Sequence, residues 1–220
     1  MTHSSIQAAI FDLDGTLADT IGDLGGAVNS VLKAHGFPQH SLPSLKKMVG
    51  NGFSMLMKRA LPDEAVINET LFRSLSEEAA SAYSRMALDT TKPYPGIVEL
   101  LRMLCERKIV CAVLSNKPDP MTKTMISSLF PDMPFIAVIG DKPDAPRKPD
   151  PSGALAIAAL SGIHPSGWAF VGDSGVDMRT GVAAGMLPLG ASWGFRGTEE
   201  LRENGAVGIL GEPGDLLRYL

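Results

Sequence analysis

The sequence predicts an α/β fold: a doubly wound, mostly parallel, Rossmann-like sheet with an inserted α-helical domain. Three observations favour this fold. Short apolar, β-branched runs recur along the chain, helical patterns separate most of them, and one long helical block interrupts the alternation. Strands that alternate with helices indicate a parallel sheet covered on both faces. Strands of such a sheet are apolar throughout, because neither face contacts water.

The apolar runs and the periodic segments between them define the expected elements. Strands are expected at residues 8–13, 109–114, 135–139, 168–171, 186–190 and, from a weaker pattern, 206–210. Helices of the same domain are expected at residues 97–107, 120–129, 152–163 and 175–184. The uncharged stretch 151–172 is long enough for a bilayer span, but His-Pro-Ser-Gly divides it. We therefore expect a short helix, a turn and a buried strand there.

The helical block lies directly after the first strand. Helical periodicity covers residues 24–35, 45–61 and 64–88, with no convincing strand between them. We expect a core domain of residues 1–18 and 92–220 and a helical cap domain of residues 19–91. In the alternative interpretation, these helices simply pack on one face of the sheet.

Composition narrows the class of protein. Of 220 residues, 45% are apolar and 20% are charged, which is typical of a globular protein with a sizeable core. The formal net charge of −4 comes without a basic block, so nucleic-acid binding is not expected. The four histidines lack the spacing of a zinc site, and the two cysteines form no C-x-x-C motif. Because no signal peptide is recognisable, we expect a cytoplasmic protein.

Polar residues gather where the expected strands end. They are Asp12 and Asp14 after the first strand, residues 115–117 after the second, Lys148 after the third, and Asp173 and Asp177 after the fourth. In an open parallel sheet, ligands bind beyond the carboxyl ends of the strands. An Asp-Gly turn alone would explain residues 14–15, but it does not explain why four separate segments each place polar residues at the end of a strand. We therefore expect these residues to form one site.

Clustered carboxylates repel one another, and a hard divalent cation such as Mg²⁺ relieves that repulsion through oxygen ligands. An aspartate can also act as a nucleophile and form an aspartyl-phosphate, with a nearby carboxylate as acid and base. Asp12 and Asp14 would face opposite sides of an ideal strand. The chain must therefore leave the strand at residues 13–15, where Gly15 eases the bend.

Four motifs resemble, in order, those of the haloacid dehalogenase-like superfamily. They are Asp12-Leu13-Asp14-Gly15-Thr16, Ser115-Asn116, Lys148-Pro149, and Gly172-Asp173 with Asp177. The resemblance implies that Asp12 is the nucleophile and Asp14 the general acid and base. Ser115 and Lys148 would bind phosphoryl oxygens, and Thr16 would help to seat the phosphate.

The same resemblance implies a Mg²⁺ site formed by Asp12, the backbone carbonyl of Asp14, and Asp173. Asp177 would be a further ligand or would support one. Superfamily members that hydrolyse carbon–halogen bonds lack an aspartate at position 14, whereas phosphatases and phosphomutases have it. The resemblance therefore implies phosphoryl transfer.

The helical block suggests a subgroup. Segments 23–29, 49–52 and 58–61 resemble the helical cap of phosphoglycolate phosphatases, and residues 114–118 fit the same subgroup. Gly50, Asn51 and Gly52 are expected to bind a small anion through backbone N–H groups and the Asn51 side chain. Asn116 and Lys117 are further expected substrate-binding residues. In the alternative interpretation, Gly-Asn-Gly is a plain loop between helices.

We expect a Mg²⁺-dependent phosphoric monoester hydrolase of carbohydrate metabolism that acts on 2-phosphoglycolate. The alternatives are a phosphatase for a sugar phosphate or pyrophosphate, a β-phosphoglucomutase-like mutase, and a catalytically silent binding protein. The expected partner is a small phosphorylated metabolite. We expect neither nucleic acid nor membrane as a partner, and a monomer or homodimer.

Overall fold

The computed structural model describes residues 6–50, 52–86 and 88–220. Its contacts divide the chain into two compact units, which we call the core unit (Met1–Ala18 with Pro93–Leu220) and the helical unit (Asp19–Lys92). The helical unit is therefore inserted into the core unit shortly after the first strand.

The core unit contains a six-stranded sheet in the order β5-β4-β1-β6-β7-β8, in which all the neighbouring strands described pair in parallel. Its strands are β1 (Ala8–Phe11), β4 (Val110–Pro118), β5 (Ala137–Asp141), β6 (Trp168–Gly172), β7 (Leu187–Ala191) and β8 (Gly208–Leu210). The chain builds outward from β1 to β5 and then returns to continue with β6. The connections leave β1 and β6 in opposite directions, so the switch point at which doubly wound sheets bind ligands lies at the carboxyl ends of these two neighbouring strands.

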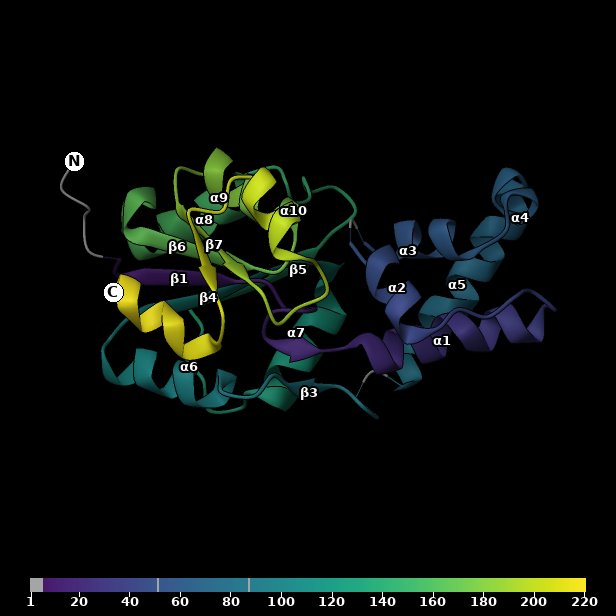
Figure 1. Cartoon of the computed structure of the whole chain (residues 1–220), viewed down its shortest axis with the longest axis horizontal. Coiled ribbons are helices and arrows are strands. Elements are labelled where there is room, and N and C mark those ends of the chain that lie inside the picture. Colours follow the sequence, from purple (N-terminus) through teal and green to yellow (C-terminus); the bar gives the residue numbers. More distant parts are fainter. Residues whose placement is uncertain (1–5, 51, 87) are drawn as a thin grey trace. The chain divides into compact units, whose positions relative to one another are not determined.

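Helices cover both faces of this sheet (Figure 1). They are α6 (Ile97–Glu106), α7 (Asp119–Leu129), α8 (Ser152–Ser161), α9 (Gly175–Ala183) and α10 (Thr198–Glu203), with 3-10 turns η1 (Pro165–Gly167) and η2 (Pro213–Tyr219). Side chains of α6, α7 and η2 pack on one face together with Phe11, and those of α8 pack on the other together with Ile10. Successive β1 side chains thus enter opposite halves of the core, as strand geometry requires. The predicted doubly wound α/β fold is confirmed.

The helical unit contains α1 (Ile21–Ala34), α2 (Leu42–Met48), α3 (Phe53–Ala60), α4 (Asp63–Ile67) and α5 (Glu69–Met86). Two predictions were wrong here, because residues 45–61 and 64–88 each form two helices. The first helix ends at Val49, whose ψ of 147° is extended, and Gly50 and Gly52, with φ angles of 119° and 88°, stay outside the helical region until α3 begins. The second break falls at Asn68, whose ψ of 93° is extended.

The two segments that connect the units are β2 (Ala18–Asp19) and β3 (Lys92–Pro93), which form a two-stranded sheet. Within the helical unit, the buried Asp23 side chain joins the start of α1 to the segment before β3. It accepts hydrogen bonds from the backbone and the hydroxyl of Thr90 (2.9 and 2.5 Å) and of Thr91 (3.0 and 2.6 Å). Burial raises the pKa of Asp23, but these bonds more than offset it, so the pKa is lowered.

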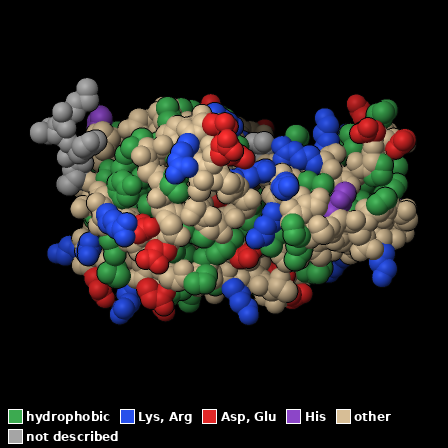
Figure 2. Space-filling view, in the orientation of Figure 1, with side chains coloured by type: hydrophobic (Ala, Val, Ile, Leu, Met, Phe, Trp, Pro, Cys, Tyr) green, Lys and Arg blue, Asp and Glu red, His purple; other side chains and the backbone are tan. Residues whose placement is uncertain are grey.

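Residues 151–172 form α8, η1 and β6, as predicted. In the part of the chain that the structure describes, every helix is too short or too polar to cross a membrane. Acidic and basic side chains are interspersed with apolar ones on the face shown in Figure 2.

Candidate active site

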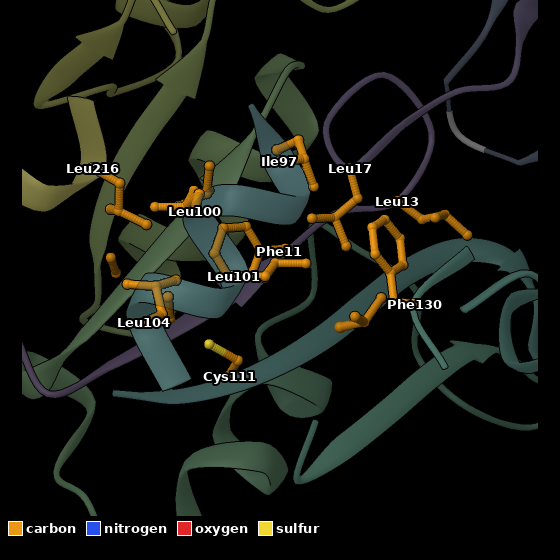
Figure 3. Close-up of a cluster of buried hydrophobic side chains, with 14 of the residues drawn as sticks. Phe11, Leu13, Leu17, Ile97, Leu100, Leu101, Leu104, Cys111, Phe130 and Leu216 are labelled. Carbon is orange, nitrogen blue, oxygen red and sulfur yellow. The ribbon is translucent and has the colours of Figure 1, made fainter. Parts of the chain in front are cut away.

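The end of β1 is fixed by the core, and this positions Asp12. Phe11 and Leu13 are fully buried in the hydrophobic cluster shown in Figure 3, together with Leu101 and other side chains of α6. Gly15 has a φ of 86°, so the chain bends away from the strand as predicted. Asp12 is thus held between two apolar anchors at the carboxyl end of the central strand.

Lys148 links Asp12 to Asp177. Its ammonium nitrogen lies 2.9 Å from Asp12 Oδ1 and donates a hydrogen bond of 2.7 Å to Asp177 Oδ1. The other oxygen of Asp177, Oδ2, accepts hydrogen bonds from the backbone and the hydroxyl of Ser174, the residue that precedes α9. Burial lowers the pKa of Lys148, but the two carboxylates more than offset this effect and raise it, so the ammonium is charged.

Asp173 brings a third carboxylate to the same place from the end of β6. One oxygen from each of Asp12, Asp173 and Asp177 lies within 4.8 Å of the others, and all three residues are buried. Burial, with contributions from the neighbouring carboxylates, raises the pKa of Asp12 to about 7 although Lys148 opposes it. Burial and the carboxylates of Asp177 and Asp12 raise the pKa of Asp173 well above its ordinary value. The Lys148 ammonium is therefore not enough by itself to offset the effect of burial and like charge on Asp12 and Asp173.

This donor set fits a hard divalent cation. Three carboxylates share one ammonium here, so ionising all of them would leave two negative charges to be compensated, which is the charge that a dication supplies. In addition, Asp12 Oδ1 is buried and no described residue gives it a hydrogen bond of good geometry. Mg²⁺ takes oxygen ligands and often binds through one or two carboxylates. Asp12, Asp173 and Asp177 could hold it.

The Asp14 side chain lies outside this cluster of carboxylates and pairs with Lys117. The Lys117 ammonium lies 2.8 and 3.1 Å from the two carboxylate oxygens. Lys117 belongs to the last part of β4, which includes Ser115 and runs past the predicted end at residue 114. The pairing of β4 with β5 shifts register between Leu114 and Pro118, so this end of the strand is irregular.

Two predicted substrate-binding residues of the core unit make contacts inside the protein. Asn116 exchanges two hydrogen bonds of 3.0 Å with the backbone N–H and carbonyl of Lys148. It thereby fixes the loop that carries the lysine. The Thr16 hydroxyl is buried without a hydrogen-bond partner among the described residues, whereas the Thr16 carbonyl accepts a bond from Trp193.

The structure thus brings together at one sheet edge the residues predicted for the core unit. Gly50 and Gly52 lie in the helical unit, between α2 and α3, and Asn51 lies outside the described residues. Within the helical unit, the Arg59 guanidinium donates hydrogen bonds to the carbonyls of Met48 and Gly50.

Sequence reasoning missed the support of Asp177 by Ser174 and of Asp173 by the backbone of Phe195. A backbone donor such as the Phe195 N–H leaves no signal in the sequence.

Residues 9–191 match the family described as haloacid dehalogenase-like hydrolase, and the chain belongs to that family. The match covers the helical unit, most of the core unit and every predicted site residue.

The named relatives of the chain belong to one subgroup of this family. The chain is 29% identical to phosphoglycolate phosphatase 1 of Pseudomonas aeruginosa over 96% of its length and 78% of the relative's. It is 30% identical to the phosphoglycolate phosphatase of Haemophilus influenzae, over 96% of both chains. A crystal structure from Haemophilus somnus 129pt, described as a predicted phosphoglycolate phosphatase, superposes with a TM-score of 0.89 at 26% identity over 98% of both chains. Within its family, the chain is a phosphoric monoester hydrolase, and it is similar to these phosphoglycolate phosphatases.

Proposed function

We propose that the protein hydrolyses 2-phosphoglycolate to glycolate and phosphate, with Mg²⁺, through an aspartyl-phosphate on Asp12. The observation that carries the proposal is the buried carboxylate cluster at the end of β1 and β6, in which Lys148 neutralises only part of the charge. A site of this kind binds a cation and a phosphoryl group together. The names of the relatives from Pseudomonas aeruginosa and Haemophilus influenzae support the choice of substrate.

In the first half of the reaction, an Asp12 carboxylate oxygen attacks phosphorus and the bond to the glycolate oxygen breaks. Asp14, which takes up a proton when its ion pair with Lys117 opens, donates that proton to the oxygen, so glycolate leaves with a neutral hydroxyl group. In the second half, Asp14 takes a proton from water, whose oxygen attacks phosphorus. The bond to Asp12 breaks, phosphate leaves and the carboxylate is restored. General acid–base catalysis of this kind raises the reaction rate by roughly 10²–10⁴-fold.

Lys148 and Ser115 bind phosphoryl oxygens in this proposal, and Asn116 and Asp177 hold Lys148 in place. Mg²⁺ would be held by Asp12, Asp173 and the backbone carbonyl of Asp14, and would neutralise charge on the phosphoryl group. Because both oxygens of Asp177 already accept hydrogen bonds, we assign Asp177 chiefly to orienting Lys148.

Gly50, Asn51 and Gly52 stay predictions for contacts to the substrate. Lys117, which is paired with Asp14, has to release that carboxylate far enough for it to reach the leaving oxygen. The same ion pair keeps the Asp14 side chain in one position between turnovers.

The test is phosphate release, with and without Mg²⁺, from 2-phosphoglycolate, pyrophosphate and several sugar phosphates. We expect Mg²⁺-dependent release with the highest kcat/KM for 2-phosphoglycolate, and none from Asp12→Asn. The matched control is Asp144→Asn, the same change at an exposed residue of the core unit.

Higher kcat/KM for another phosphate would overturn the substrate while keeping the chemistry. Isomerisation of a glucose phosphate with little phosphate release would indicate a mutase instead. Unchanged hydrolysis by Asp12→Asn would overturn the aspartyl-phosphate route.

A further inference from the structure

Residues 193–195, which follow β7, contact two parts of the site at once; we call them the strap. The indole N–H of Trp193 donates a hydrogen bond of 3.0 Å to the carbonyl of Thr16. The backbone N–H of Phe195 donates one of 2.7 Å to Asp173 Oδ2. The strap therefore connects the loop after β1 to the carboxylate at the end of β6, two segments that are far apart in the sequence.

Gly194 allows the strap to approach this closely. A Cβ atom at position 194 would lie 2.2 Å from the Cβ of Asp173 and 2.4 Å from the backbone carbonyl oxygen of Gly15. Neither atom is the end of a flexible side chain that could rotate away. Any side chain at this position would therefore displace Asp173 or the loop that carries Asp14.

These contacts restrict the Asp173 carboxylate. The Phe195 N–H holds one of its oxygens, which limits how far the carboxylate can rotate. Groups that hydrogen-bond to metal-holding carboxylates orient them, and losing such a group typically lowers metal affinity by about 10–100-fold. The strap is thus well placed to act on the cation without touching it.

We propose that the strap sets the affinity of the carboxylate cluster for Mg²⁺, with Trp193 and Gly194 as positioning residues. This inference rests on the proposed function, because it requires Asp173 to hold the cation. Trp193 fixes the loop after Asp14, and Gly194 lets the Phe195 N–H reach Asp173.

Calorimetric titration of the whole protein with Mg²⁺, without substrate, tests the inference directly. Trp193→Phe keeps an aromatic ring and removes the N–H donor, and we expect the Kd for Mg²⁺ to rise about 10-fold. Trp168→Phe is the matched control, since the Trp168 indole N–H bonds only to the backbone of Ile163 in the described structure. That variant should keep the wild-type Kd.

A second pair of variants tests the close packing. Gly194→Ala should weaken Mg²⁺ binding more than Trp193→Phe does. Gly197→Ala should not weaken it, because a Cβ atom there meets no described atom within 4 Å. Urea unfolding of each variant without Mg²⁺ measures stability separately.

The outcomes separate the two proposals. A wild-type protein that binds no Mg²⁺ would overturn the proposed function. Normal binding by the wild type together with an unchanged Kd in Trp193→Phe would overturn the role of the strap, even if that variant were less stable.

Discussion

Lys148→Met removes the ammonium that lies between the buried carboxylates of Asp12 and Asp177 and keeps most of the side chain's apolar volume. The side chains of Lys148 and Asp177 are 3% and 1% exposed, and that of Asp12 is 11% exposed. Removing one partner of a buried ion pair costs about 3–5 kcal/mol, because the other charge stays buried and uncompensated. The protein should lose that much stability, a large part of the roughly 5–15 kcal/mol typical of a domain.

Urea unfolding at neutral pH, followed by tryptophan fluorescence, measures this loss of stability in the core unit. Both tryptophans, Trp168 and Trp193, belong to the core unit. With an m-value near 3 kcal/mol/M, the midpoint should fall by roughly 1–2 M. Mg²⁺ should stabilise the variant more than the wild type, since the cation would replace the missing positive charge.

Lys142→Met is the matched control, because Lys142 is an exposed lysine of the same core unit. Its midpoint should stay close to that of the wild type. A loss below about 1 kcal/mol in Lys148→Met, the ordinary value of a surface ion pair, would refute the reasoning that these charges depend on Lys148. An equal response of both variants to Mg²⁺ would refute the link between the lysine and the cation.

Three further outcomes are expected. Asp14→Asn should lower kcat by roughly 10²–10⁴-fold with little change in KM; steady-state kinetics would contradict the acid–base role if only KM changed. Ca²⁺ should inhibit the Mg²⁺-supported reaction, because its looser geometry and higher coordination number misplace the reacting groups, and full activity with Ca²⁺ alone would count against the proposed arrangement. Asp23→Asn should lose about 1.5–3 kcal/mol at neutral pH, the value of hydrogen bonds to a charged group. Because the folded pKa of Asp23 lies below 3.8, its contribution is complete above that pH and disappears as the pH falls further. Urea midpoints of wild type and variant should therefore converge in acid, and a constant difference would show that the carboxylate charge is not responsible.

The sequence alone determined the core architecture and predicted which segments meet at one end of the sheet. Apolar runs located the strands of the core sheet, because a strand buried on both faces must be apolar along its whole length. The parallel order then placed the Asp12, Lys148 and Asp173 segments at one edge, since the carboxyl ends of parallel strands meet there. Local patterns carried this information, and the structure agrees with it.

Local helix signals were less reliable in the helical unit. Residues 45–61 carry enough helical periodicity to suggest one helix, yet the helix ends at Val49, and Gly50 and Gly52 adopt positive φ angles. A glycine inside an apolar periodic pattern is compatible both with a helix interior and with a break. Packing of the finished unit decides between them.

Only the tertiary structure decided which charge each polar group meets. Lys117 pairs with Asp14, which lies 103 residues earlier, and Trp193 bonds to Thr16 across 177 residues. Such partners depend on strand register, on the irregular end of β4 and on the path of the loops, which only the complete packing of the chain determines. A hydrogen bond requires its two atoms to lie within a few tenths of an ångström of one distance. Periodicity and composition locate an element far less finely than that.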